Sequence, residues 1–386
     1  MRCSTLLCIF LLSTTLVFAT DIDSCQTLSS SDTYVLNASV QSDASCFSIG
    51  ASNLLLDCNG HTITFGNAGG GATRAISGGS GRTNVTIQNC IIEKTNTSGA
   101  ESWAISVSVS NSTITNNSIR THGQYENHGI RIDGNYNLVE GNIIVTNGTG
   151  GSNFGLYLGT ASYNRLQNNN ITTDGGSGSD AVYFTPGSLY HDNSFVNNSF
   201  LTLPSFSTGL YIRQENTTVQ SNTFSTTRYD IWIRDYDGTH LIDQPDATME
   251  INNANVKISR KGLGSVAFSE KITEIIGNLS SVVDISYNEI FVDTETEPGL
   301  NVSAQVRLEG LPYLDPRPLI DIDDDGTYTF CEDCTIVSYS NGTFVYDVAH
   351  FTTYSSQEVP PVPEFSTIAL LAGLIIILSG FVVMRT

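Results

Sequence analysis

Short apolar strands recur along the chain from Asn84 to about Asp235, separated by turns rich in Gly and Asn. Each repeat contains two strands, and a new repeat begins about every 24 to 29 residues, a spacing typical of repeat architectures. The repeats open at Asn84, Asn111, Tyr136, Tyr163, Asp192 and Asn216. One repeat cannot bury its apolar face alone, but stacked repeats share a continuous core.

The second strand of each repeat alternates apolar residues with others, which is the periodicity of a strand with one buried face. If each repeat forms one coil, its apolar positions stack inside. The predicted inward residues are Ile130, Leu156, Val182, Leu210 and Ile231, with Ile132, Leu158, Phe184, Ile212 and Ile233 beside them. Short strands, tight turns and one repeat per coil predict a parallel β-helix over residues 20–244.

An asparagine recurs between the two strands of successive repeats. These residues are Asn117, Asn142, Asn169, Asn198 and Asn222. Asn tolerates left-handed backbone conformations, and stacked amides can hydrogen-bond from coil to coil. We therefore expect these residues at a turn, joined in a ladder along the helix.

The repeat pattern resembles that of right-handed parallel β-helix proteins with pectate-lyase-like repeats, which occur on archaeal and bacterial surfaces. The segment from Asn53 to Ile63 is similar to an opening coil of exported archaeal members. The resemblance implies a right-handed helix and a protein that works outside the cell. It concerns a repeat pattern, so it bears on the fold more than on the function.

Residues 245–356 continue as strands without the recurring asparagine, and regular turns separate them, which predicts an antiparallel β-sandwich. The run from Asp284 to Thr353 resembles immunoglobulin-like modules that follow β-helices in archaeal surface proteins. Such a module would cap the helix and space it from a membrane. The expected fold class is all-β: a right-handed parallel β-helix, then a β-sandwich, plus a C-terminal transmembrane helix.

Both ends of the chain carry apolar segments. Residues 1–19 have the pattern of a secretory signal peptide. Residues 365–386 contain an apolar run long enough to cross a bilayer, after a Pro-rich linker at 357–364. The string Val362-Pro-Glu-Phe resembles the C-terminal sorting signals of archaeal surface proteins. We expect an exported protein at the cell surface, on the extracellular face of the membrane, with a single C-terminal anchor.

The formal net charge is −21 at pH 7. Such a field repels nucleic acid, so we expect no nucleic-acid partner. It is compatible with cations or neutral glycans. Export makes Asn-X-Ser/Thr sites candidates for glycosylation, and the expected sites are Asn37, Asn96, Asn147, Asn278, Asn301 and Asn341.

Three cysteine pairs follow the signal peptide, and an exported setting permits disulfides. They are Cys25 with Cys46, Cys58 with Cys90, and Cys331 with Cys334. The first pair is expected to close the N-terminal end of the helix. The second pair lies at near-equivalent positions of adjacent coils, as a disulfide or as two stacked thiols. For the third, a small-loop disulfide is favoured over a redox or zinc site.

An outward column lies between the inward positions of the second strands. Its members are Arg131, Tyr157, Tyr183, Tyr211 and Trp232. In register, the aromatic residues form a ladder that could bind sugar rings of a polysaccharide. The alternative is that these rings only stabilise the strands by packing on one another.

Acidic residues beside this column are the candidates for catalysis. Asp133, Asp235 and Asp237 lie just past the strands. Cleaving a glycosidic bond by hydrolysis needs two carboxylates at a suitable separation. Asp133 and Asp235 are about four coils apart, too far for such a pair, so solvated turn acids are the favoured interpretation.

A calcium-binding loop is predicted from Asp321 to Glu332, where the spacing matches an EF-hand loop. Its expected ligands are Asp321, Asp323, Asp325, Thr327 and Glu332. The flanking segments have strand character rather than helical character, so an acidic hairpin turn is the alternative.

Taken together, these patterns favour a membrane-anchored surface protein that recognises glycans or associates with the cell envelope without catalysis. A polysaccharide lyase or glycoside hydrolase acting on the β-helix face is the alternative, and a purely structural stalk is a third.

Overall fold

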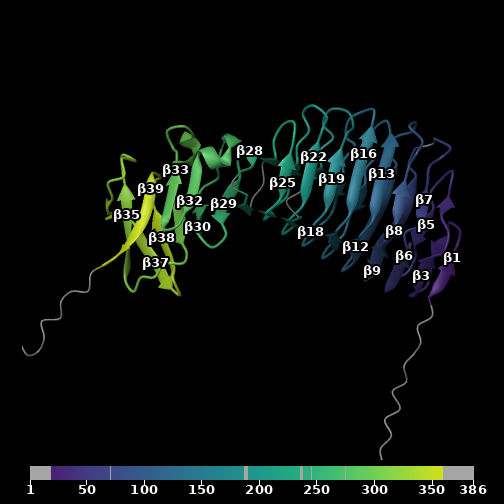
Figure 1. Ribbon diagram of the computed structural model, residues 1–386, viewed down its shortest axis with the longest axis horizontal. Coiled ribbons are helices and arrows are strands. Elements are labelled where there is room, and N and C mark those ends of the chain that lie inside the picture. Colours follow the sequence, from purple (N-terminus) through teal and green to yellow (C-terminus); the bar gives the residue numbers. More distant parts are fainter. Residues whose placement is uncertain are drawn as a thin grey trace, which may run out of the picture.

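The computed structural model is an elongated rod of stacked coils, with the N-terminal and C-terminal strands at opposite ends (Figure 1). It describes residues 19–69, 71–186, 190–234, 238–244, 246–273 and 275–359. The alternating pattern folds as expected, into a right-handed parallel β-helix, and each coil contributes one strand to each of three sheets.

The three parallel sheets are called A, B and C. The parallel part of sheet A contains β1 (Thr20–Ile22), β3 (Thr33–Leu36), β6 (Leu54–Asp57), β9 (Val85–Gln88), β12 (Thr113–Thr115), β15 (Leu138–Glu140), β18 (Arg165–Gln167), β21 (Ser194–Val196), β24 (Thr218–Gln220), β27 (Thr239–Asp243) and β29 (Asn255–Arg260). That of sheet B contains β2 (Thr27–Leu28), β5 (Phe47–Ile49), β8 (Arg74–Thr83), β11 (Trp103–Ser110), β14 (Ile130–Ile132), β17 (Leu156–Leu158), β20 (Val182–Phe184), β23 (Leu210–Ile212), β26 (Ile231–Arg234) and β28 (Thr248–Asn252). Sheet C contains β4 (Val40–Gln41), β7 (Thr62–Thr64), β10 (Ile91–Glu93), β13 (Ser118–Gly123), β16 (Ile143–Gly148), β19 (Asn170–Thr173), β22 (Ser199–Thr202) and β25 (Thr223–Ser225).

The core is the space that the three sheets enclose. All ten predicted inward residues of sheet B are at most 1% exposed. They pair from coil to coil along the sheet, for example Leu156 with Val182. The prediction of the core is therefore confirmed for this sheet.

The corner between sheets A and C holds the predicted asparagine ladder. The side-chain oxygen of Asn142 accepts hydrogen bonds from the backbone and side-chain nitrogens of Asn117, both at 3.0 Å. The same contacts join Asn142 to Asn169, Asn169 to Asn198, and Asn198 to Asn222. These asparagines are buried. The left-handed conformation expected of them belongs instead to the residue before each: Asn116, Gly141, Asn168, Asn197 and Ser221.

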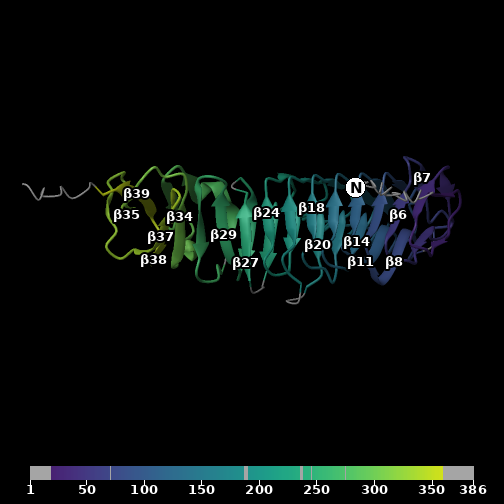
Figure 2. The ribbon, with the colours of Figure 1, turned by 90° about the horizontal axis from the view of Figure 1, so that it is seen from below.

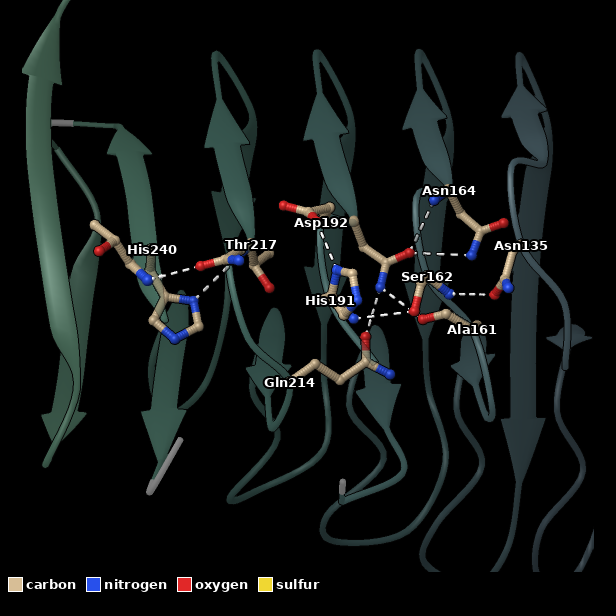
Figure 3. A network of polar contacts seen from close by, with 12 residues as sticks. Asn135, Ala161, Ser162, Asn164, His191, Asp192, Gln214, Thr217 and His240 are labelled. Atoms are coloured by element: carbon tan, nitrogen blue, oxygen red, sulfur yellow. Dashed lines mark hydrogen bonds and ion pairs between the residues drawn. The ribbon is translucent and has the colours of Figure 1, made fainter. Parts of the chain in front are cut away.

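The other two corners also carry a column of buried polar side chains, one from each coil. Their mixed residue types form no pattern that is visible in the sequence. At the corner from sheet B to sheet A, the buried polar residues are Ser112, Asn137, Asn164, Asn193, Thr217 and His240. Figure 3 shows part of this corner, where Asn164 donates to Asn193 at 3.0 Å and the Thr217 amide donates to His240 Nδ1 at 3.3 Å. At the corner from sheet C to sheet B, they are Thr73, Ser102, Asn127, Asn153, Ser179 and Ser207.

The parallel stack extends past residue 244. Strands β28 and β29 still pair in parallel with β26 and β27. Gln244 explains why the sequence pattern stops earlier, because its side chain ends the asparagine ladder by bonding both to the Asn222 amide at 2.6 Å and to the Asn222 carbonyl at 2.7 Å.

The C-terminal part is antiparallel and continuous with the helix. Sheet A continues from β29 through β30 (Gly264–Phe268), β34 (Ala304–Leu308), β38 (Thr343–Val348) and β37 (Thr335–Ser340), and sheet B ends with β31 (Ile275–Asn278). A separate antiparallel sheet contains β32 (Val283–Ser286), β33 (Glu289–Val292), β39 (Thr353–Glu358), β35 (Pro316–Asp321) and β36 (Thr329–Phe330). Two short 3₁₀ helices are η1 (Leu279–Ser281) and η2 (Pro298–Leu300). Figure 2 shows the coils and these strands in one unbroken row.

All three expected disulfides are present: Cys25–Cys46, Cys58–Cys90 and Cys331–Cys334. The second resolves the choice between a bridge and stacked thiols in favour of the bridge.

Among the described residues, no helix has the length and apolar character needed to span a bilayer. Residues 1–18 of the predicted signal peptide and the predicted anchor at 365–386 lie outside those residues.

Candidate ligand-binding groove on sheet B

The outward column predicted from the sequence is formed in register. Arg131 pairs with Tyr157, Tyr157 with Tyr183, Tyr183 with Tyr211, and Tyr211 with Trp232. Ser106 precedes this column and Glu250 follows it. The aromatic part is therefore flanked by polar positions at both ends.

A second column runs beside the first, three residues earlier on each coil. It contains His128, Phe154, Asp180, Thr208 and Tyr229, linked by backbone hydrogen bonds from coil to coil. The repeat pattern of the sequence does not reveal this column, because its residues lie at the ends of loops and share no residue type. Their constant offset from the inward residues is the signal that could have found them.

Rings of the two columns interleave. Phe154 stacks on Tyr183 at a centroid distance of 4.4 Å, and Tyr211 stacks on Trp232 at 4.2 Å. The stacking breaks between Tyr183 and Tyr211, whose rings meet edge to face at 71°. Because stacked rings cover one another's faces, much of what they offer a ligand is ring edges and hydroxyls. This geometry supports packing as one role of the aromatic residues.

The two columns and the neighbouring loops line a groove of about 430 Å³. Its lining residues are Trp103, Glu126, His128, Arg131, Ser152, Phe154, Tyr157, Gly178, Asp180, Tyr183, Phe206, Tyr211, Arg228 and Trp232. All five residues of the predicted column are among them. The volume lies in the range of small-molecule sites, and the groove follows the long axis across several coils.

A column of threonines in sheet C fixes the loops that form one wall of the groove. Thr121, Thr146, Thr173 and Thr202 are buried and pair with one another along sheet C. Each hydroxyl donates to the carbonyl of the ladder residue at the corner of its own coil, as Thr146 does to Asn153 at 2.8 Å. These bonds close each loop at its base and so place the second column.

Lys94 takes the equivalent position one coil earlier. Its side chain is fully buried, and its Nζ donates to the carbonyls of Asn96, Ser98 and His122 at 2.8, 3.1 and 2.8 Å. Burial lowers the pKa of this lysine. Its bonds to three carbonyls indicate a structural role.

Two buried ionisable groups belong to the second column. Burial lowers the pKa of His128 to about 3, so its imidazole is neutral, and Nδ1 accepts the Phe154 amide at 3.2 Å. Burial raises the pKa of Asp180 to about 7, although the Thr208 amide and the Arg228 charge act in the opposite direction. The Thr208 amide donates to Asp180 Oδ1 at 2.7 Å.

Of the predicted catalytic acids, the structure describes Asp133. Asp133 binds Arg131 through two contacts, at 2.6 and 3.1 Å, and accepts the Thr160 amide at 3.3 Å. These bonds give Asp133 a structural role in holding Arg131. Asp235 and Asp237 lie outside the described residues.

The predicted calcium loop folds around Asp321. The Asp321 side chain is buried and accepts the backbone amides of Asp325 at 3.2 Å and Gly326 at 2.7 Å. Among the described residues, the one group of three close metal-ligating side chains is Cys331, Asp333 and Cys334, and its two cysteines form a disulfide. The loop acids and Glu332 do not converge in this structure, and calcium binding stays a prediction.

Of the expected glycosylation sites, Asn37, Asn278, Asn301 and Asn341 are exposed, and Asn96 and Asn147 are half-buried.

One family model matches part of the chain. Residues 50–224 match the family model described as "Right handed beta helix region". A curated relative, the nuclear pore complex protein Nup98-Nup96 of Dictyostelium discoideum, is 35% identical over 120 residues. That match covers 26% of this chain and 6% of the relative, so the chain spans a small part of its length.

Three solved structures have low similarity to the chain. ORF18 of Geobacillus virus E2 has 12% identity and a TM-score of 0.36, over 86% of this chain and 71% of that one. A tailspike mutant of E. coli bacteriophage HK620, in complex with a pentasaccharide, has 10% identity and a TM-score of 0.31, over 85% and 69%. DFA-IIIase from Arthrobacter chlorophenolicus A6, without its lid, has 10% identity and a TM-score of 0.31, over 55% and 57%. The family model therefore identifies a right-handed β-helix region at residues 50–224, and the function is argued from the chemistry of the groove.

Proposed function

We propose that this protein is an exported surface protein that binds a polysaccharide along the groove of sheet B. The single observation that carries this proposal is the groove itself, with its in-register column from Arg131 to Trp232. Each coil contributes similarly placed side chains to the groove. Such a groove suits a ligand that also repeats along its length. Ring edges, tyrosine hydroxyls and guanidinium groups provide the apolar surface and the hydrogen bonds that sugars require.

Export and membrane attachment complete the proposal. The apolar segments at 1–19 and 365–386 support it, and so do the disulfides, which persist in an oxidising compartment. The groove would then face outward at the cell surface.

Calorimetry with acidic and neutral polysaccharides tests the binding function on the secreted portion, residues 20–358. We expect at least one polysaccharide to bind, and Tyr211→Ala to weaken that binding by about tenfold, because Tyr211 lines the groove and stacks on Trp232. Tyr136→Ala is the matched control, since Tyr136 is 55% exposed and lies outside the groove. Binding of no polysaccharide would reject the proposal, and release of oligosaccharides would replace it with an enzymatic function.

A further inference from the structure

The groove gathers arginines in a protein that has few basic residues. The chain carries 17 Lys and Arg residues against 38 Asp and Glu residues. Arg131 and Arg228 line the groove. Arg74 lies 3.8 Å over the Trp103 ring, and Arg213 donates to the Tyr183 hydroxyl at 3.1 Å. The groove is thus a local concentration of guanidinium groups within a strongly negative protein.

The two arginines of the lining differ in how firmly a carboxylate of the protein holds them. Arg131 makes the two-contact pair with Asp133 described above. Arg228 lies 4.1 Å over the Trp232 ring and 5.0 Å over the Tyr229 ring. Its contact with a carboxylate, from Nη2 to Glu250 Oε2, is 3.7 Å, longer than a direct hydrogen bond. The rings support the guanidinium group, which also interacts with the Tyr229 hydroxyl. Because a guanidinium group carries five N–H donors, donors remain for a second carboxylate.

Asp180 lies in the same groove and is a different kind of acid from Glu126, the other carboxylate of the lining. Glu126 is exposed, whereas Asp180 is 6% exposed. One oxygen of Asp180 accepts the Thr208 amide. The neutral ring of His128 accepts the Phe154 amide in the same way, so this capping role does not require an ionisable acid.

We propose that Asp180 and Arg228 together bind the carboxylate of an acidic sugar unit, with Asp180 acting as a protonated acid. This inference rests on the proposed function, and it names the ligand class as a glycan that carries carboxylate groups. The Asp180 hydroxyl donates to one ligand oxygen, and the Arg228 guanidinium donates to the ligand carboxylate. No covalent bond changes, and the proton stays on Asp180.

Ionisation of Asp180 would weaken this binding in two ways. The new negative charge repels the ligand carboxylate, and it also attracts Arg228, whose charge already acts on Asp180. Since the pKa of Asp180 is about 7, binding should weaken as the pH rises through neutrality. A neutral sugar would show neither the preference nor the pH dependence.

Several other charged and titratable groups lie around Asp180, and they come from several elements of the fold. Glu126 comes from the loop before β14, Arg131 from β14, and the three tyrosines of the column from β17, β20 and β23. Glu250 comes from β28 and contacts Arg228. His128 has a pKa of about 3 and stays neutral across this range. A transition near pH 7 that depends on residue 180 would therefore identify Asp180.

The test compares acidic oligosaccharides with their methyl esters, which keep the sugar and remove the charge. Calorimetry would use oligogalacturonate, glucuronate-containing and sialylated probes at about pH 6 and about pH 8.5, on either side of the Asp180 transition. We expect an acid probe to bind about tenfold more tightly at the lower pH, and its ester to bind weakly at both. Arg228→Gln should abolish the preference for the acid over the ester, while Arg120→Gln, on sheet C, should not change it.

Asp180→Asn separates protonation from structure, because the amide oxygen can still accept the Thr208 amide and the side chain cannot ionise. We expect this variant to bind the acid probe equally at both pH values. An ester that binds as well as its acid, or wild-type binding that does not change with pH, would overturn the inference and leave the proposed function intact. Binding of no glycan at all would overturn the proposed function itself.

Discussion

The asparagine ladder and the groove column are both built from one residue per coil, yet their sequences differ in kind. The ladder repeats Asn five times, from Asn117 to Asn222, whereas the groove column reads Arg, Tyr, Tyr, Tyr and Trp between a Ser and a Glu. In the ladder each amide bonds to the coil before and the coil after, so the position selects a side chain that both donates and accepts hydrogen bonds. In the column the backbone already pairs the strands, and the side chains are free to vary. Columns whose side chains bond from coil to coil therefore hold the solenoid together, and columns free of that requirement give it a specific surface.

The largest effect should come from interrupting the ladder. Asn169→Ala removes a side chain that bonds to Asn142, Asn198 and the Val139 carbonyl. It leaves buried polar groups without partners, and we expect a loss of about 4 kcal/mol in the free energy of unfolding. Urea unfolding measures it. The control is Asn170→Ala, an exposed neighbour, which should change stability by less than about 0.5 kcal/mol; equal effects of the two substitutions would show that the ladder contributes nothing special.

The next effect should depend on pH. Burial lowers the pKa of His240 from 6.5 to about 4, so the native protein holds the neutral imidazole. Stability from this group is complete above pH 6.5 and is lost as the pH falls toward 4, by roughly 3 kcal/mol at pH 4. His240→Asn supplies the oxygen that the other ladder residues use and cannot be protonated. Unfolding free energies of the two proteins should diverge on acidification, in favour of the variant, and parallel curves would contradict this reasoning.

The smallest effect should fall on the groove wall. Thr146→Val keeps the shape of the side chain and removes the hydroxyl that bonds to the Asn153 carbonyl. We expect a loss of about 1 kcal/mol in stability and faster amide hydrogen exchange in residues 149–152. The half-exposed Thr172 is the control, and Thr172→Val should leave exchange in this loop unchanged. A loop that exchanges at the same rate in both variants would show that the threonine column does not position the wall.

Strand periodicity is enough to predict the fold and the first groove column, because alternation places Tyr157 outward whenever Leu156 and Leu158 point inward. Periodicity cannot reveal the second column. His128, Phe154 and Asp180 come from loop ends, and their position in the groove depends on hydrogen bonds that threonines of sheet C make at the base of each loop. The EF-hand spacing from Asp321 to Glu332 is equally a sequence match, but it lies between strands, and the loop uses Asp321 to bind its own backbone.

Sheet A passes from the parallel coils into the antiparallel end without interruption, from β1 to β37. A continuous hydrogen-bonded sheet resists bending and twisting at the junction. The coils and the antiparallel end should therefore move as one rigid body rather than as two bodies on a flexible joint. Any contact that fixes the orientation of the C-terminal strands would therefore also fix the orientation of the groove, several coils away. Neighbouring copies held in the same way would present their grooves in parallel, as an oriented array.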